Sequence, residues 1–328
     1  MDFRTELVVP PAEWNLALHD RLITIGSCFS DTIGQRLMSN KFSVTVNPFG
    51  TTYHPLAIDR LIGYATYQEY PPEDSYLINQ EHAFNYNFHS SFWNSTTENL
   101  RLDVEGMINT VHQQIKESRC LLITYGTAWL FERTDNGQAV ANCHRMPSGG
   151  FRRRLASVDE IITSFKKMHG ALRSINPGIK IILTVSPVRH LKDTLPSNSV
   201  SKAALRLACH QLTSFDNVDY FPAYELLLDD LRDYRFYADD LIHPSAVAEE
   251  YIWKKFAETY FTRDTLRILS AWRQVRQSLA HKPFHPGSES HQEFIRQTLG
   301  KLEQLSAFLD VEKEMTDLRD QLKLPSVS

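Results

Sequence analysis

Cysteine and glycine are both scarce in this chain, which has 328 residues, 4 of them cysteine and 13 glycine. The four cysteines lie far apart and form no Cys-x-x-Cys pair, which argues against a disulfide framework or a zinc motif. We therefore expect reduced thiols and a cytoplasmic location. No glycine-rich loop has the pattern that binds a phosphate or a dinucleotide, so we expect no cofactor. The cysteines are Cys28, Cys120, Cys143 and Cys209.

Long hydrophobic runs and a strong excess of one charge are also missing. No apolar run approaches the ~20 residues needed to cross a bilayer, and residues 1–6 do not resemble a signal peptide. The 35 basic and 39 acidic residues give a formal net charge of −4, which provides no general attraction for nucleic acid. We expect neither a membrane nor a nucleic acid as a partner.

Up to about residue 260, short β-rich runs alternate with longer helical patterns. This alternation is typical of an α/β fold, in which helices cover both faces of a parallel sheet. The expected strands are 22–25, 43–46, 121–124, 179–185 and 218–221. The expected helices are 31–39, 55–67, 102–117, 158–175, 202–214 and 246–256. An Asn-Gly turn between 129–132 and 139–142 predicts a β-hairpin after the third strand.

Residues 77–99 are irregular and rich in aromatic side chains and histidine. A connection this long is often functional, and we expect His89 and Trp93 to stack on a substrate. The alternative is a loop that is packed by its own aromatic side chains. The run Arg152–Arg154 is interpreted as a solvated basic face.

The character of the chain changes after Tyr260. We expect a catalytic domain over residues 1–260 and a C-terminal helical extension over 261–328, with helices at 262–280 and 289–323. The second helix has one apolar face. That face packs either on the core or on a second subunit, which makes a homo-oligomer a further expectation.

Gly26 and Ser27 end the first strand and precede a helix. A serine at such a turn becomes a nucleophile when a base takes its proton and backbone amides, here those of Ser27 and the first helical residues, face the oxyanion. The alternative is a helix N-cap. Cys28 is a rival nucleophile because a thiol is more reactive, although a small buried cysteine that supports the turn is the commoner role.

Asp240 and His243 are separated by three residues in a segment rich in turn residues. Pro244 favours an extended conformation for His243 and opens the next helix. Asp240 can then accept a hydrogen bond from the ring and hold its tautomer. Asp239 is the fallback carboxylate. Serine, histidine and aspartate together are the components of a hydrolase triad.

Three weaker positions follow strands or the hairpin. Gly50 offers a backbone amide to an oxyanion, Thr127 a hydroxyl, and Asn142 a side-chain amide, but ordinary turn structure explains each equally well. The histidines do not have the spacing of a zinc site, so we expect no metal. The histidines considered are His82, His89 and His144.

Several blocks of the sequence, in this order, resemble the GSCFA-domain family, which is similar to the SGNH (GDSL-like) hydrolases. The match runs from about residue 21 to 250, and the segment 283–286 is also similar. The blocks are 26–30, 47–50, 124–129, 142–144, 185–189 and 234–244.

The resemblance implies a three-layer α/β/α, flavodoxin-like fold with a five-stranded parallel sheet. It implies Ser27 as nucleophile, His243 as base, Asp240 as its orienter and Gly50 as an oxyanion donor. Where SGNH enzymes carry Gly-x-Asn-Asp, this chain has residues 126–129 without an asparagine. Asn142 or Thr127 must then replace that donor. The family blocks also make two residues candidates for substrate binding, and these are His144 and Arg189.

The predicted function is a serine esterase that cleaves an acyl ester, often acetyl, of a carbohydrate or other small molecule. The enzyme would form an acyl-enzyme on Ser27 and then release the acid with water. An acyltransferase with the same triad and a non-catalytic binding module are the alternatives.

Overall fold

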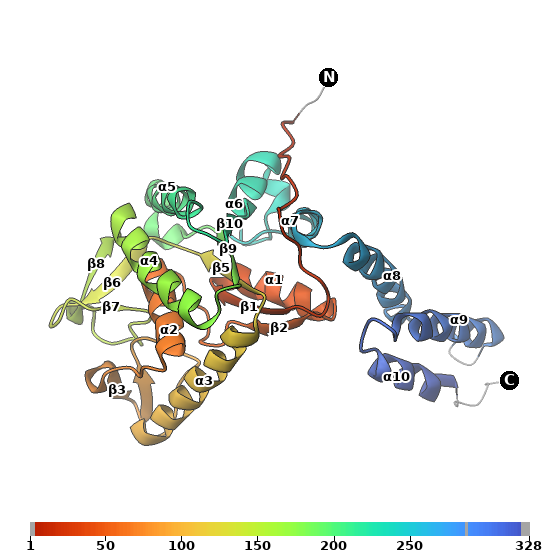
Figure 1. Ribbon diagram of the computed structural model, residues 1–328, viewed down its shortest axis with the longest axis horizontal. Coiled ribbons are helices and arrows are strands. Elements are labelled where there is room, and N and C mark those ends of the chain that lie inside the picture. The colour runs from red at the N-terminus through yellow and green to blue at the C-terminus, as the bar shows by residue number, and fades with distance from the viewer. Residues whose placement is uncertain (1–3, 286–287, 323–328) are drawn as a thin grey trace.

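The computed structural model describes residues 4–285 and 288–322 (Figure 1). Its central sheet has five parallel strands in the order β10-β9-β5-β1-β2. In chain order this is the 2-1-3-4-5 arrangement of flavodoxin-like folds, so the predicted fold class is confirmed. The bounds agree with the predicted strands to within one residue at either end. They are β1 (Arg21–Gly26), β2 (Ser43–Val46), β5 (Cys120–Tyr125), β9 (Lys180–Val185) and β10 (Val218–Tyr220).

Successive side chains of the central strands face opposite layers of the molecule. Ile23 and Leu121 pack in the core under α2 (Pro55–Tyr67), α3 (Thr97–Glu117), α4 (Val158–Ile175) and α5 (Leu195–Leu212). Leu22 and Leu122 pack on the other face, under α1 (Cys28–Ser39), α6 (Ala223–Glu225) and α7 (Ala246–Tyr260). Both faces are therefore buried, which explains why the strands are almost continuously apolar.

Three helices begin earlier than predicted: α1 begins at Cys28 and not at residue 31, and α3 and α5 have caps that lie further upstream. The side chain of Thr96 accepts a hydrogen bond from the Asn99 amide, so α3 begins at Thr97. Thr194 caps α5, which begins at Leu195 with a proline in its first turn, a position that proline tolerates.

Residues within the aromatic stretch form a hairpin, contrary to the irregular loop that we predicted. Strands β3 (Tyr76–Asn79) and β4 (His82–Asn85) pair antiparallel. The turn residues Gln80 and Glu81 have φ of 48° and 68°, as a two-residue hairpin turn requires.

The predicted hairpin with the Asn-Gly turn is confirmed as β6 (Trp129–Arg133) and β7 (Ala139–Val140), and a third strand, β8 (Phe151–Leu155), pairs with β6. Strand β8 contains the arginine run. Arg152 and Arg154 form ion pairs with the buried Glu132, so the run is part of a folded sheet and is more than a solvated face.

The C-terminal extension consists of α8 (Arg263–Leu279), α9 (Glu289–Leu305) and α10 (Glu312–Leu322). The single helix predicted over 289–323 is wrong, because the chain turns after Leu305 and buries Leu309 and Val311 between the helices. Residues 286–287 and 323–328, which include part of the predicted helix break and the predicted end of the extension, lie outside the described residues. No helix in the described part combines the length and apolarity needed to cross a bilayer.

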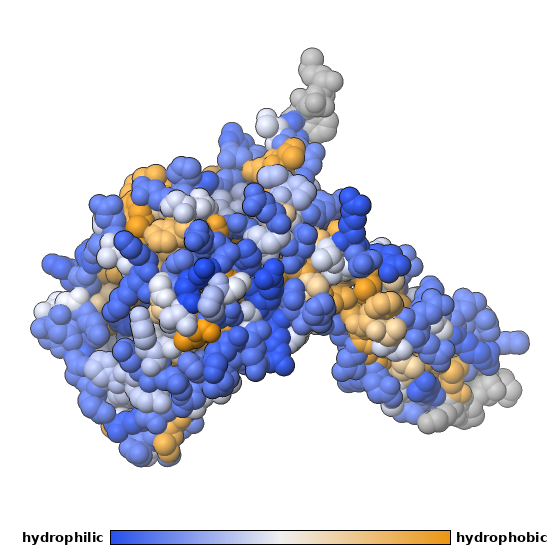
Figure 2. All heavy atoms as spheres, in the orientation of Figure 1, coloured by the Kyte–Doolittle hydropathy of each residue, from blue (hydrophilic) through white to orange (hydrophobic). Residues whose placement is uncertain are grey.

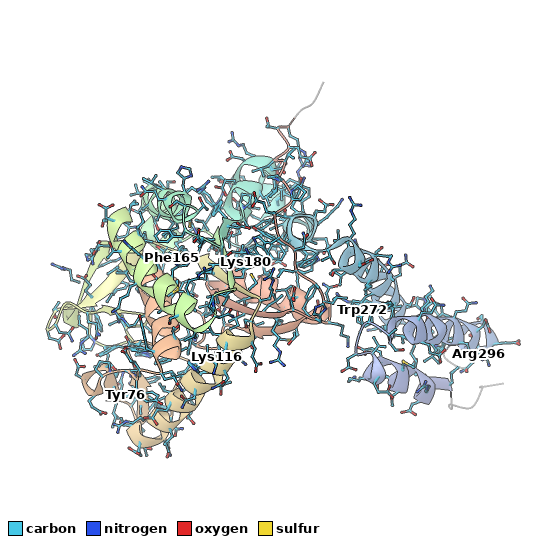
Figure 3. All side chains as sticks on the ribbon, viewed as in Figure 1. Tyr76, Lys116, Phe165, Lys180, Trp272 and Arg296 are labelled. Atoms are coloured by element: carbon cyan, nitrogen blue, oxygen red, sulfur yellow. The ribbon has the colours of Figure 1, made fainter. Side chains whose placement is uncertain are left out.

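The apolar faces of these three helices pack on one another, and the apolar face predicted for 289–323 lies in this shared core. Figure 2 shows hydrophobic side chains gathered where α8 meets α9 and α10. The unit contacts the α/β body at the end of α1, where Trp272 Nε1 donates to Ser39 O at 2.9 Å and Lys41 pairs with Glu314 at 2.7 Å. Figure 3 shows Trp272 at this junction and Arg296 far from it.

The backbones of β1 and β5 are in close contact at Gly26. Gly26 has φ of 143°, and a Cβ placed there would lie 2.2 Å from Thr124 O. The next amide, of Ser27, donates to the same Thr124 oxygen at 3.1 Å. Asn47 Oδ1 accepts from the Gly26 amide at 2.8 Å. Only glycine fits between the strands at the point where the chain leaves β1 for α1.

Gly26→Ala should lower the free energy of unfolding by about 1–3 kcal/mol, the usual effect of overpacking. The expected cause is the contact of the new methyl group with a backbone oxygen that cannot move aside. Gly106→Ala is the control, because Gly106 lies in α3 with nothing near its would-be Cβ and should stabilise by about 0.5–1 kcal/mol. Urea unfolding of both variants measures the difference, and equal effects would contradict the contact.

Candidate active site

The predicted pair Asp240 and His243 lies on the loop that precedes α7. Asp240 Oδ2 lies 2.6 Å from His243 Nδ1, and Oδ1 accepts from the amides of Ile242 and His243 at 2.9 and 3.0 Å. These hydrogen bonds lower the pKa of Asp240 to about 2. Leu241, with φ of 57°, makes the tight turn that brings the two side chains together. The neighbouring Asp239 is exposed, and Asp240 is the carboxylate that faces the ring.

The loop that carries His243 is held at both ends. The Ala238 amide donates to His243 O at 2.8 Å. Arg189, after β9, lies over the ring of Tyr237 at 3.9 Å and donates to Leu241 O at 3.4 Å. Arg189, which we predicted as a substrate-binding residue, therefore holds the loop in place through these contacts.

The opposite nitrogen of the ring faces Cys28. His243 Nε2 lies 3.7 Å from Cys28 Sγ, and Cys28 is partly exposed at the first position of α1. Ser27, the predicted nucleophile, is 1% exposed, and its Oγ is buried without a hydrogen-bond partner. The Ser27 amide, predicted as an oxyanion donor, is bonded to Thr124 O. The histidine thus pairs with the residue next to the one that we predicted.

Charges on several sides act on the Cys28 thiol. Burial, followed by the Asp31 carboxylate, raises the pKa of Cys28, whereas the Lys202 ammonium and the amides of Phe29 and Cys28 oppose that rise. Lys202 is 1% exposed and donates to Gly126 O and Ser186 O, both at 2.7 Å. Burial lowers the pKa of Lys202 to about 7.

Asn47 connects the β1–α1 turn to the loop after β2. Its Oδ1 accepts from the Gly26 amide, and its Nδ2 donates to Asp31 Oδ1 at 2.7 Å. Thr51 donates to the other Asp31 oxygen at 3.2 Å. We did not predict Asn47 and Asp31 as site residues, although Asn47 lies in the family block 47–50, which also contains Gly50.

The predicted oxyanion donors Gly50 and Thr127 are already engaged. The Gly50 amide donates to Asn47 O at 2.8 Å. Thr127 Oγ1 lies 3.0 Å from Ser201 Oγ and accepts from the Trp129 amide at 3.1 Å. The Gly50 amide is therefore engaged within its own loop, and the Thr127 hydroxyl is paired with Ser201 of α5, where either oxygen can be the donor.

Asn142 and His144 lie beside the β3–β4 hairpin. Asn142 Oδ1 accepts from the His144 amide at 2.8 Å. The His144 ring stacks on Phe84 at 4.8 Å, and its Nε2 lies 2.9 Å from Asn85 O. These contacts serve the packing of the hairpin, and none of them joins Asn142 or His144 to Cys28 or His243.

His89 and Trp93, the predicted stacking residues, occupy different places. Trp93 is 51% exposed and packs on His82 at 4.4 Å, so it belongs to the hairpin. A Cβ added to Gly50 would lie 2.5 Å from the Cβ of His89, so His89 packs against the loop after β2. Among the described residues, no three His, Cys, Asp or Glu side chains form a group that could hold a metal ion.

His190 is a further residue of the site that we missed. Its Nε2 is buried without a hydrogen-bond partner, and its ring lies 5.8 Å from that of Tyr53. Burial, followed by the charges of Lys202 and, more weakly, His243, lowers the pKa of His190 to about 4, so its ring is neutral. The recognised block 185–189 ends one residue before it.

The site is open to solvent. The side chains of His243 and Asp240 are 49% and 45% exposed. Two cavities lie elsewhere in the molecule. One of about 560 Å³ lies between α2 and α4, and one of about 1090 Å³ lies between α1, α7 and α8. Neither is lined by Cys28 or His243.

Comparison with known proteins identifies a family. Residues 21–256 match the model of the GSCFA family, and residues 272–324 match that of the GSCFA domain protein, C-terminal domain. No curated protein sequence matches the chain.

Three solved structures that the chain resembles are carbohydrate esterases. The family 3 enzyme from Talaromyces cellulolyticus is 11% identical, with a TM-score of 0.34 over 76% of this chain and 98% of that one. The family 2 enzyme from Corynascus thermopiles, with its carbohydrate binding domain, is 11% identical, with a TM-score of 0.35 over 82% and 69%. The family two enzyme from Clostridium thermocellum, in complex with cellohexaose, is 12% identical, with a TM-score of 0.34 over 81% and 67%. With such low scores, the fold assignment rests on the strand order.

Asp31→Asn should lower the pKa of Cys28, because it removes a negative charge that disfavours the thiolate. The rate of alkylation of Cys28 by iodoacetamide, followed by mass spectrometry between about pH 6 and 10, should then reach half its maximum at a lower pH than in the wild type. Asp239→Asn is the matched control and should leave the curve in place. A curve that stays put or moves to higher pH in Asp31→Asn would contradict this electrostatic account.

Proposed function

Because the chain belongs to the GSCFA family, we propose that its site cleaves acyl esters through a covalent acyl-enzyme. One observation carries this proposal. A carboxylate at 2.6 Å from Nδ1 holds the His243 ring so that Nε2 faces the first residue of α1. A base that is oriented by a carboxylate and directed at a nucleophilic side chain is the arrangement required for acyl transfer.

Each part of the reaction has a group in position. Asp240 accepts the Nδ1 hydrogen of His243, which leaves Nε2 free to take a proton from the nucleophile. The nucleophile lies on the β1–α1 turn, which carries the predicted Ser27 and its neighbour Cys28. The first amides of α1, at Cys28 and Phe29, have no acceptor within the helix and are suited to an oxyanion. Water, deprotonated by His243, then releases the acid.

The proposed substrate is a small acyl ester, such as an acetyl ester, of a carbohydrate or another small molecule. An open site admits a bulky alcohol portion. Tyr53, 36% exposed, has its ring 5.8 Å from that of His190, and Tyr234, 62% exposed, has its ring 5.3 Å from the Arg189 guanidinium. Exposed aromatic rings are suited to stacking on a sugar. His89, beside Gly50, remains a further candidate.

The exposure of the His243 and Asp240 side chains favours hydrolysis over transfer of the acyl group to another acceptor. Transfer requires a covered site from which water is excluded. The C-terminal helices contact α1 at Ser39, the end opposite to Cys28, and so do not supply such a cover. Water therefore has free access to the side of the acyl-enzyme that carries His243.

Hydrolysis of 4-nitrophenyl acetate by the purified protein tests the proposal. His243→Ala should lower kcat/KM by about 10²–10⁴, the usual contribution of a general base. His19→Ala is the control, because His19 is 88% exposed and its one described ion pair is local. A wild type that hydrolyses no acyl ester, or a His243→Ala variant as active as the control, would reject the hydrolase assignment.

Asp240→Asn should reduce kcat by about 10⁴ while the fold is retained, by analogy with the loss seen when a triad aspartate becomes asparagine. The physical reason is that an amide no longer holds the ring tautomer whose Nε2 accepts the proton. Asp239→Asn, at an exposed position that does not face the ring, should be nearly silent. If the two variants exchanged their effects, Asp239 would be the true orienter.

A further inference from the structure

We propose that the thiol of Cys28, rather than the hydroxyl of Ser27, is the nucleophile that forms the acyl-enzyme. This inference rests on the proposed acyl hydrolase function and specifies its central residue. It replaces the expected serine triad with a triad of cysteine, histidine and aspartate. Four features of the site support it.

The first feature is the direction of the histidine. Asp240, His243 and Cys28 form one continuous relay, with contacts of 2.6 Å at Nδ1 and 3.7 Å at Nε2. The larger sulfur atom makes 3.7 Å a hydrogen-bonding separation. Ser27 Oγ has no such partner, so no base is in position to take its proton.

The second feature is access. Cys28 is partly exposed, whereas Ser27 is 1% exposed. The Ser27 Cβ lies against Gly126, where an added Cβ would be only 3.2 Å from it. Ser27 therefore packs against the exit of β5, whereas the Cys28 sulfur lies 3.7 Å from His243 Nε2.

The third feature is that Cys28 differs from the other cysteines. Cys120 and Cys209 are 2% and 0% exposed within the two cores. Cys143 is partly exposed like Cys28, and burial raises the pKa of both thiols. Among the described residues, Cys28 is the cysteine whose sulfur is within hydrogen-bonding distance of an imidazole.

The fourth feature is the stabilisation of the anion once it forms. The amides of Cys28 and Phe29 and the buried Lys202 all favour the thiolate, while burial and Asp31 keep the resting side chain protonated. Because the pKa of Cys28 is raised, the thiol is its resting form, and its proton moves to His243 as the sulfur attacks. This differs from a preformed thiolate–imidazolium pair.

The reaction then proceeds in two balanced halves. The Cys28 S–H proton moves to His243 Nε2, a C–S bond forms at the acyl carbon, and the carbonyl oxygen becomes an oxyanion. The intermediate collapses with cleavage of the ester C–O bond, and the alcohol leaves with the proton from Nε2. Water then gives a proton to Nε2 and attacks the thioester, the C–S bond breaks, and the sulfur regains the proton as the acid departs.

Four variants assayed with 4-nitrophenyl acetate test the assignment. Cys28→Ala should lose activity by about 10⁴ or more, as happens when a triad nucleophile is removed. Cys28→Ser keeps the shape of the turn and should lose most activity, because the hydroxyl is a poorer nucleophile at this separation. Ser27→Ala should stay within about tenfold of the wild type, since it removes only a buried hydroxyl. Cys143→Ala is the matched cysteine control and should be unchanged.

The loss of activity in Ser27→Ala, combined with activity in Cys28→Ala, would overturn the thiol assignment while leaving a serine hydrolase in place. Equal loss in Cys28→Ala and Cys143→Ala would also overturn it. Circular dichroism and the urea midpoint of each variant separate loss of chemistry from loss of folding.

Alkylation provides a readout that needs no substrate. Iodoacetamide should modify Cys28 before Cys143 in the folded wild type, and His243→Ala should slow modification of Cys28 at neutral pH and leave Cys143 unaffected. Modification should abolish any ester hydrolysis in parallel. If Cys28 reacts no faster than Cys143, or if His243→Ala has no effect, the thiol–imidazole pair is refuted. If the pair is confirmed but no ester is cleaved, the hydrolase function fails and the activated thiol stands.

Discussion

The close backbone contact between β1 and β5 at Gly26 is the constraint on which the site depends. With no side chain there, the Ser27 amide reaches Thr124 O and the chain turns directly into α1. This turn buries the side chain of residue 27 and makes residue 28 the first of the helix. A bulkier residue at position 26 would push β1 away from β5, and the thiol of Cys28 would lose its place beside His243.

All the loops that leave the carboxyl edge of the sheet contribute to the same place, as expected for an open parallel sheet. Asn47 after β2 binds the β1–α1 turn, and Gly126 after β5 lies against Ser27. Arg189 after β9 holds the loop of His243. The buried Lys202 joins the exits of β5 and β9 through Gly126 and Ser186. These contacts join the loops around the partly exposed thiol and imidazole.

Helix α1 runs from the site to the C-terminal helices. Its first residue, Cys28, lies at the site, and Ser39 at its last turn accepts the Trp272 hydrogen bond of the C-terminal helices. Those helices have their own small core and project from the body (Figure 1). They therefore leave the side chains of His243 and Asp240 exposed to solvent.

The sequence by itself determined the elements and the local pairs. Apolar runs of strand length separated by helical periodicity placed the five strands correctly, since these patterns reflect which faces are buried. The pairing of Asp240 with His243 was also readable, because residues three apart on a tight loop meet without help from the rest of the chain. The antiparallel β3–β4 hairpin escaped prediction, since a Gln-Glu turn with positive φ carries no glycine or asparagine signal.

Only the tertiary structure decided which of two adjacent side chains meets the histidine. Ser27 and Cys28 are neighbours at the junction of β1 and α1, and their side chains point in different directions. His243, which lies beside Cys28, is 215 residues away in the sequence. The same limit applies to Gly50 and Thr127, whose residue types suited an oxyanion until their hydrogen bonds to Asn47 and Ser201 were seen. Residue type and spacing predict what a side chain can do, but its direction and its free hydrogen-bonding groups depend on neighbours distant in the chain.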